Sequence, residues 1–160
     1  MTDRKKIIGV IGASSATAEG LRLAEEVGRL LAESGSALVC GGLSGVMEAA
    51  AKGCTEAGGE VIGILPGPSA VAANAYVTLA VPTNMGHARN VIIAHTAQSL
   101  VAVEGEYGTL SEAAISLKLG KEVFALRPRH SLEGMTVVQT AEEAVRMAVD
   151  SAGTVDSRSV

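Results

Sequence analysis

Short, uniformly apolar segments alternate with amphipathic ones along most of this chain, and this alternation limits its fold more than any other feature. Buried strands are expected at 6–11, 37–40, 60–65, 76–81, 99–103, 122–126 and 135–139. Helical spacing of apolar side chains predicts helices at 18–34, 44–57, 85–96, 109–119 and 140–149. Strands that are apolar on both faces and separated by helices indicate a parallel sheet. We therefore predict an α/β, Rossmann-like fold, with a mostly parallel sheet of six to seven strands and helices on both faces.

Length and composition narrow the function classes. The 160 residues predict a single nucleotide- or phosphate-binding domain over residues 1–150, followed by a polar tail at 151–160. A net charge of -4, without a basic run and with 2% aromatic residues, argues against nucleic-acid binding. Cys40 and Cys54 are expected to be buried free thiols, and no residue spacing predicts a metal site. Without a signal peptide or membrane-length apolar run, a cytoplasmic protein is expected.

Glycine-rich turns follow three of the predicted strands and provide the candidate site. The turns after the second and fifth strands lead into helices, whose N-termini favour anions. Because parallel strands end at one edge of a sheet, we expect the three turns to converge on one pocket for a small phosphorylated ligand. The candidate ligand-binding residues are Gly12, Ser14, Ser15, Gly41, Gly42, Gly45, Met47, Gly105, Tyr107, Gly108 and Thr109.

Two alternatives to this interpretation bear on the turns. A dinucleotide site fails in detail, because the first turn lacks the GxGxxG spacing and no acidic residue follows the second strand. A Walker-type GxxxxGK[ST] motif is also missing from the sequence. The second alternative involves no ligand. In it, the glycines only allow tight strand–helix packing, and Thr109 and Glu112 form a T-x-x-E capping box.

At these turns the sequence resembles the LONELY GUY superfamily over about residues 5–150. The superfamily's GGxxGxM turn is matched by residues 41–47, and its PGGxGTxxE motif is matched imperfectly by residues 104–112. An arginine upstream of that glutamate corresponds to Arg89, within the sequence Gly-His-Ala-Arg-Asn at 86–90. The short length and this arginine segment resemble the branch that contains the algal molybdenum-cofactor carrier protein.

The resemblance implies functions that the residue patterns alone do not. Hydrolytic members cleave the N-glycosidic bond of a nucleoside 5'-monophosphate, which would make Arg89 and Glu112 the catalytic pair. Gly105, Gly108 and Thr109 would hold the phosphate, and no cofactor would be required. The carrier branch instead binds a phosphorylated pterin. The hypotheses are therefore a phosphoribohydrolase first, a carrier of molybdenum cofactor second, and a member that has lost its site third.

The resemblance also implies a homodimer, with the helix that carries Arg89 near the partner. The apolar run at 91–93 on that helix favours the same expectation. One departure from the family pattern affects the ligand, because Glu104 and Glu106 replace the Pro and the second Gly of the motif. Both carboxylates are expected to weaken phosphate binding, unless they point into water or Arg127 or Arg129 neutralises one of them.

Overall fold

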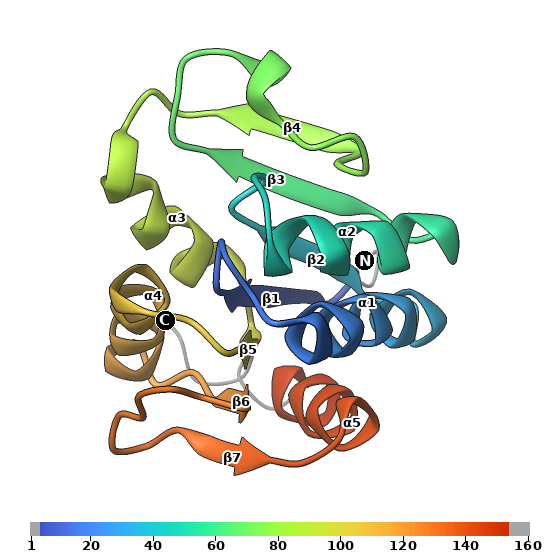
Figure 1. The fold of residues 1–160 in the computed structure, drawn as a ribbon, viewed down its shortest axis with the longest axis vertical. Helices are drawn as coiled ribbons and strands as arrows, with labels where there is room; N and C mark the ends of the chain where they lie inside the picture. Colours follow the sequence, from blue (N-terminus) through green and yellow to red (C-terminus); the bar gives the residue numbers. More distant parts are fainter. Residues whose placement is uncertain (1–3, 154–160) are drawn as a thin grey trace.

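Seven parallel strands form one sheet in the computed structural model, which describes residues 4–153 (Figure 1). The strands are β1 (Ile7–Gly12), β2 (Ala37–Cys40), β3 (Val61–Leu65), β4 (Leu79–Pro82), β5 (Ser99–Val103), β6 (Val123–Leu126) and β7 (Thr136–Val138). Their order across the sheet is β4-β3-β2-β1-β5-β6-β7, and every neighbouring pair is parallel. The predicted α/β, Rossmann-like fold is therefore confirmed.

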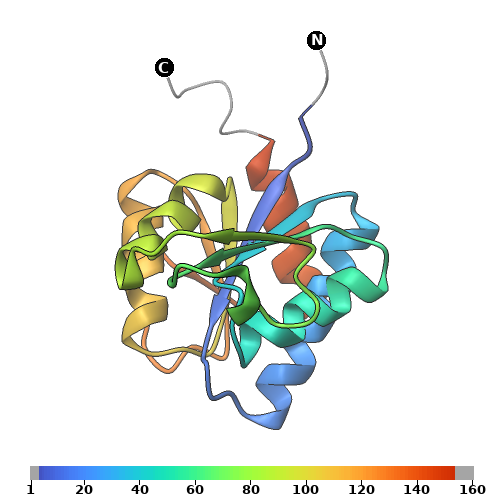
Figure 2. The same cartoon turned by 90° about the horizontal axis from the view of Figure 1, so that it is seen from above.

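Helices cover both faces of this sheet, as Figure 2 shows from above. One face carries α1 (Ala18–Glu33), α2 (Val46–Glu56) and α5 (Ala141–Ala152), and the other carries α3 (Arg89–Thr96) and α4 (Tyr107–Lys118). Two short 3-10 helices, η1 (Ala70–Ala72) and η2 (Gly86–Ala88), lie in the connections. None of the helices within residues 4–153 is long and apolar enough to cross a membrane.

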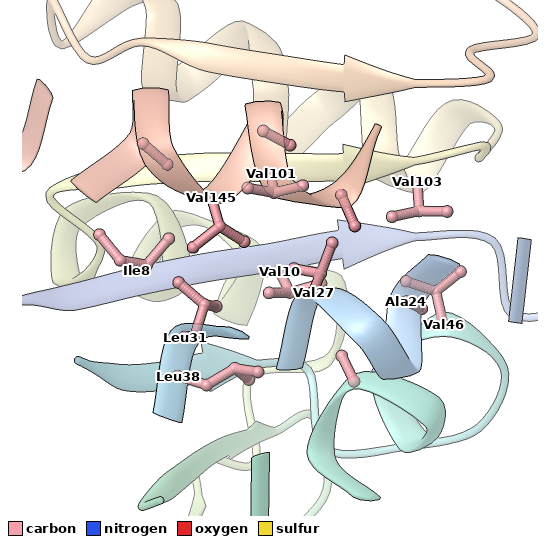
Figure 3. Packing of buried hydrophobic residues seen from close by; sticks show 14 of the residues in the cluster. Ile8, Val10, Ala24, Val27, Leu31, Leu38, Val46, Val101, Val103 and Val145 are labelled. Carbon is pink, nitrogen blue, oxygen red and sulfur yellow. The ribbon is translucent and has the colours of Figure 1, made fainter. Parts of the chain in front are cut away.

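The larger of two buried apolar clusters joins the sheet to α1, α2 and α5 (Figure 3). Val10 of β1 and Val101 of β5 are fully buried there, beside Val27 of α1 and Val145 of α5. The opposite cluster places Ile93 of α3 against the other face of the same strands. Because β1 and β5 are buried on both faces, they form a rigid centre that fixes where their carboxyl ends lie.

Capping chemistry explains several helix ends. The Thr17 hydroxyl begins α1 by accepting a hydrogen bond from the Gly20 N–H, and Gly35 follows its end at φ +78°. The sequence T-A-E-E at 140–143 has the spacing of a capping box, which the structure forms only in part. Thr140 accepts from the Glu143 N–H, but the Glu143 carboxylate binds the Gln139 N–H rather than that of Thr140.

Several predicted boundaries were wrong. β4 begins at Leu79 rather than at residue 76, because Asn74 holds residues 76–77 in a turn. The helix predicted at 85–96 is divided into η2 and α3, and α2 begins at Val46 rather than at residue 44. The last helix continues to Ala152, so residues 151–152 are helical rather than part of a polar tail. Gly153 is the C-cap of this helix, and residues 154–160 of the predicted tail lie outside the described residues.

Candidate functional site

A cavity of about 300 Å³ opens at the carboxyl ends of the central strands, where the strand order reverses between β1 and β5. Open α/β sheets bind their ligands at such a switch point. The cavity is lined by Val10, Ile11, Gly12, Ala13, Ser14, Ser15, Gly41, Leu43, Met47, His87, Arg89, Asn90, Glu106, Gly108, Thr109 and Glu112. The three glycine turns therefore meet at one pocket, as predicted.

The turns after β1 and β2 interlock through their backbones. The N–H of Val46, which begins α2, donates to the Ala13 carbonyl at 2.9 Å. Gly45 adopts φ +71°, and a Cβ atom there would lie 2.4 Å from that same carbonyl oxygen. Only glycine fits this close approach in the left-handed region. Gly42 and Gly45 thus shape the loop without lining the cavity, whereas Gly41 and Met47 line it directly.

The third turn brings the N-terminus of α4 to the cavity wall. Glu106 is the N-cap of α4, and the first helical N–H to find a carbonyl is that of Leu110. The N–H groups of Tyr107, Gly108 and Thr109 consequently have no intrahelical acceptor and are suited to an anion. Gly108 and Thr109 line the cavity.

The alternative capping box at Thr109 and Glu112 is wrong. The helix begins two residues earlier than predicted, so Thr109 lies inside its first turn and not at the N-cap. The chain reverses at Gly105, which has φ +109° and packs against the Thr109 side chain. Two predicted ligand residues of this turn do not line the cavity: Gly105 supports Thr109, and Tyr107 is 85% exposed.

Glu104 turns away from the cavity and binds the N-terminus of α1 instead. Its carboxylate accepts a hydrogen bond from the Thr17 N–H at 3.0 Å and another from the Thr17 hydroxyl. It packs against Gly20, and it lies 3.6 Å from Nε of Arg127. Burial favours a higher pKa for Glu104, but the Thr17 hydrogen bonds and the Arg127 charge outweigh it, so the pKa lies below its usual value. Glu104 therefore meets the exception made in the expectation, because Arg127 lies beside it and it does not line the cavity.

Glu106 remains beside the cavity, but Arg129 pairs with it. Nη1 of Arg129 donates to the Glu106 carboxylate at 2.8 Å, and both side chains are more than half exposed. A surface ion pair of this kind partly neutralises the carboxylate at little gain in stability. The two glutamates that replace the family's Pro and Gly therefore differ in role, since one supports the fold and the other lies at the rim of the pocket.

The ionised state of Glu104 should contribute to stability. We expect Glu104→Gln to lower the free energy of unfolding by about 2 kcal/mol at pH 7, because charge-assisted hydrogen bonds to a helix N-terminus are lost. The deficit should shrink as the pH falls and the wild-type carboxyl becomes protonated. Urea unfolding measures it, and Glu106→Gln on the same loop is the control, with an expected change of less than about 0.5 kcal/mol. Equal losses of unfolding free energy in the two variants would contradict a stabilising role for the Glu104 carboxylate.

Arg89 and Glu112 lie side by side at the floor of the cavity, from the first turn of α3 and the second turn of α4. Nη1 of Arg89 is 3.7 Å from Oε1 of Glu112, and both side chains are about 10% exposed. Burial raises the pKa of Glu112 to about 7, although the Arg89 charge opposes this rise. Burial also lowers the pKa of Arg89. A carboxyl group that titrates near neutral pH suits proton transfer or ligand binding.

Two polar residues of the cavity, His87 and Asn90, were not predicted from the sequence. Both flank Arg89 within one helical turn, so their positions were the available signal. A histidine at such a position is usually an ordinary surface residue, so the residue type of His87 alone predicts no role in a site. Asn90 is 6% exposed and bonds to both Arg89 and Ser111, which only the packing of α3 on α4 reveals.

Together, the fold and the cavity define a Rossmann-like protein whose glycine turns and α4 N-terminus line one cavity at the switch point. The sequence profile of the SLOG cluster4 family matches residues 5–156, and the chain belongs to this family. This finding agrees with the resemblance to the LONELY GUY superfamily and to its molybdenum-cofactor carrier branch.

Individual relatives are similar over nearly their full lengths. An uncharacterised protein of Archaeoglobus fulgidus is 50% identical over 144 residues, which cover 90% of this chain and 95% of that protein. The molybdenum cofactor binding protein of Rippkaea orientalis has a TM-score of 0.87 at 33% identity, covering 93% of this chain and 98% of that one. The molybdenum cofactor carrier protein of Chlamydomonas reinhardtii has a TM-score of 0.85 at 35% identity, covering 94% and 100%.

Proposed function

We propose that this protein binds a phosphorylated pterin of the molybdenum-cofactor type in the cavity at the β1–β5 switch point, and that it carries this ligand without cleaving it. Similarity to two proteins that bind this cofactor, over nearly the whole of each chain, supports the ligand class. The observation that carries the proposal is the first turn of α4, whose N–H groups have no intrahelical acceptor and whose residues Gly108 and Thr109 line the cavity. Such a turn accepts a phosphate, and the apolar side chains of Ile11, Leu43 and Met47 offer contacts for a ring system.

Gly108 provides a sharp test of the phosphate position. A Cβ atom on Gly108 would meet no atom within 4 Å among the described residues, so Gly108→Ala should fold normally. If a phosphate approaches this backbone, the added methyl group should weaken binding at least about tenfold, or about 1.4 kcal/mol. Calorimetry with the phosphorylated pterin of molybdenum cofactor measures the effect. Gly67→Ala is the control, since Gly67 also has open space around it but does not line the cavity. Unchanged affinity in Gly108→Ala would place the phosphate elsewhere.

Cleavage of a nucleoside 5'-monophosphate is the second candidate, and the Arg89–Glu112 pair favours it. Breaking the ribosyl C–N bond develops positive charge on the sugar, which a buried carboxylate stabilises while it aligns water. Incubation with 5'-AMP and other nucleoside monophosphates, followed by detection of free base, separates the candidates. In a hydrolase, Glu112→Gln should abolish base release. Pterin binding without base release from the wild-type protein would favour the carrier function. Fluorescence from pterin that co-purifies with the protein would support the same function.

We propose further that the protein is a homodimer that works in the cytoplasm. Val91 on α3 is 42% exposed although Ile93 on the same helix is buried, which leaves an apolar side chain for a partner. Cys40 and Cys54 are free and buried, a state that suits a reducing compartment. Light scattering at micromolar concentration tests the dimer, and a monomeric mass would refute it.

A further inference from the structure

The guanidinium group of Arg89 is held by two neighbours other than Glu112. Nη1 donates to the Oδ1 atom of Asn90, and Nη2 donates to the Gly41 carbonyl at 3.3 Å. The third nitrogen, Nε, is buried and has no hydrogen-bond partner among residues 4–153. Arg89 is therefore oriented by the backbone of the β2 turn and by an amide on its own helix.

The orientation of the Asn90 amide is fixed in turn from α4. Its Nδ2 atom donates to the Ser111 hydroxyl oxygen at 3.2 Å, and that hydroxyl donates to the Gly108 carbonyl at 2.7 Å. Because the Ser111 hydroxyl hydrogen is donated to the Gly108 carbonyl, the Ser111 oxygen acts as the acceptor for Asn90. Asn90 must then present its NH₂ group to Ser111 and its oxygen to Arg89.

Nη1 of Arg89 makes no direct hydrogen bond to Glu112. This atom is hydrogen-bonded to Asn90, but its distance of 3.7 Å from Oε1 of Glu112 is beyond the range of an N–H···O hydrogen bond. A buried arginine and carboxylate usually form direct hydrogen bonds, since that arrangement best offsets their desolvation. Here an uncharged amide takes the place nearest to Nη1.

We propose that Asn90 is a positioning residue, whose oxygen holds Nη1 of Arg89 off Glu112 and so leaves the Glu112 carboxyl group open to an N–H or O–H donor of the ligand. This inference deepens the proposed function, because it names the group that the ligand meets at the floor of the cavity. A ligand with ring N–H groups, as a pterin has, supplies such a donor.

Several charged or titratable groups surround Glu112. Arg89 faces it from α3. The buried Cys40 thiol at the end of β2 also interacts with it electrostatically, and burial raises the pKa of that thiol to about 12. His87 and Glu106 line the same cavity from η2 and from the mouth of α4. Replacing Asn90 by leucine leaves this set of charged groups unchanged. A change in the titration of Glu112 would therefore report on the position of Arg89.

The test is an NMR titration of the Glu112 carboxyl group in ligand-free protein. In Asn90→Leu, Nη1 should swing onto the carboxylate, and the pKa of Glu112 should fall from about 7 by about one unit or more. Ser111→Ala should produce a smaller fall in the pKa of Glu112, because loss of the Ser111 hydroxyl only frees the Asn90 amide to turn. Ser111 is exposed, so this variant keeps the inference testable if Asn90→Leu fails to fold. An unchanged Glu112 titration in both variants would overturn the proposal.

Two further variants separate positioning from loosened packing. Asn90→Asp keeps an oxygen for Nη1 of Arg89 and adds a like charge near Glu112, so the pKa of Glu112 should not fall. If loosened packing let water reach Glu112, its pKa would fall instead. In an Arg89→Met background, Asn90→Leu should leave the Glu112 titration unchanged, because no guanidinium remains to move. A fall in that background would assign the effect to water and contradict the proposal. Since no ligand is present, a failure of the proposed function would not affect these results.

Discussion

Replacing Gly28 by alanine should lower the free energy of unfolding by about 3 kcal/mol, although alanine ordinarily stabilises a helix interior relative to glycine. The reason is the crossing of α1 and α2, which lie side by side in Figure 1. A Cβ atom on Gly28 would lie 1.9 Å from the Ala50 carbonyl oxygen, and one on Gly53 would lie 1.9 Å from that of Glu25. The two backbones are thus in contact, and an added methyl group forces the helices apart.

Urea denaturation measures this effect, and Gly53→Ala should reproduce it from the other helix. Gly108→Ala is the matched control, because it also lies within a helix but has open space around it. The control should lose no stability. A Gly28→Ala variant as stable as the wild type would mean that α1 and α2 can separate at no cost. The effect also concerns the site, because α2 begins at the turn that lines the cavity.

Glu112→Gln should make the protein more stable above neutral pH, by up to about 3 kcal/mol at pH 8. The folded protein keeps the Glu112 proton up to a pKa of about 7, whereas the unfolded chain releases it near 4.5. Between these values the folded state binds more protons, so the stability of the wild type falls as the pH rises. Glutamine mimics the protonated acid at every pH, and the variant should therefore avoid this loss.

Unfolding free energies at pH 5 and pH 8 test the expectation. The two proteins should be similar at pH 5 and differ at pH 8, with the variant the more stable. Glu106→Gln is the control for removing a carboxylate from the same end of α4. Parallel pH profiles for wild type and Glu112→Gln would contradict a buried carboxyl group with a raised pKa. The expected gain also indicates that Glu112 is retained at a cost in stability, which is typical of functional residues.

Much of the fold could be predicted because the strands are apolar on both faces. The bounds of β2 and β5 matched the structure, since each is a short apolar run buried throughout. The predicted ends of helices and strands were wrong where side chains outside the periodic apolar pattern determine them. Asn74 delays the start of β4, and the N-cap residue of α4 is a glutamate that makes no side-chain capping bond.

The candidate site was predicted as far as glycine turns and strand ends determine it. Side-chain directions at the site depend on contacts between distant segments, which no local pattern contains. Glu104 binds Thr17 across 87 residues of sequence, and Asn90 reaches Ser111 across 21. The sequence therefore located the pocket, but it could not tell a carboxylate that faces the ligand from one that supports a helix.

The position of Glu104 has a consequence for the size of ligand that this fold can accept. Dinucleotide-binding Rossmann domains place a pyrophosphate at the N-terminus of the helix that follows the first strand. In this chain a carboxylate of the protein already satisfies that helix, while the neighbouring N-terminus of α4 faces the cavity. A second linked phosphate would have to compete with an internal anion that is buried and paired. We therefore expect the proposed site to bind a ligand with one phosphate more tightly than a ligand with two linked phosphates.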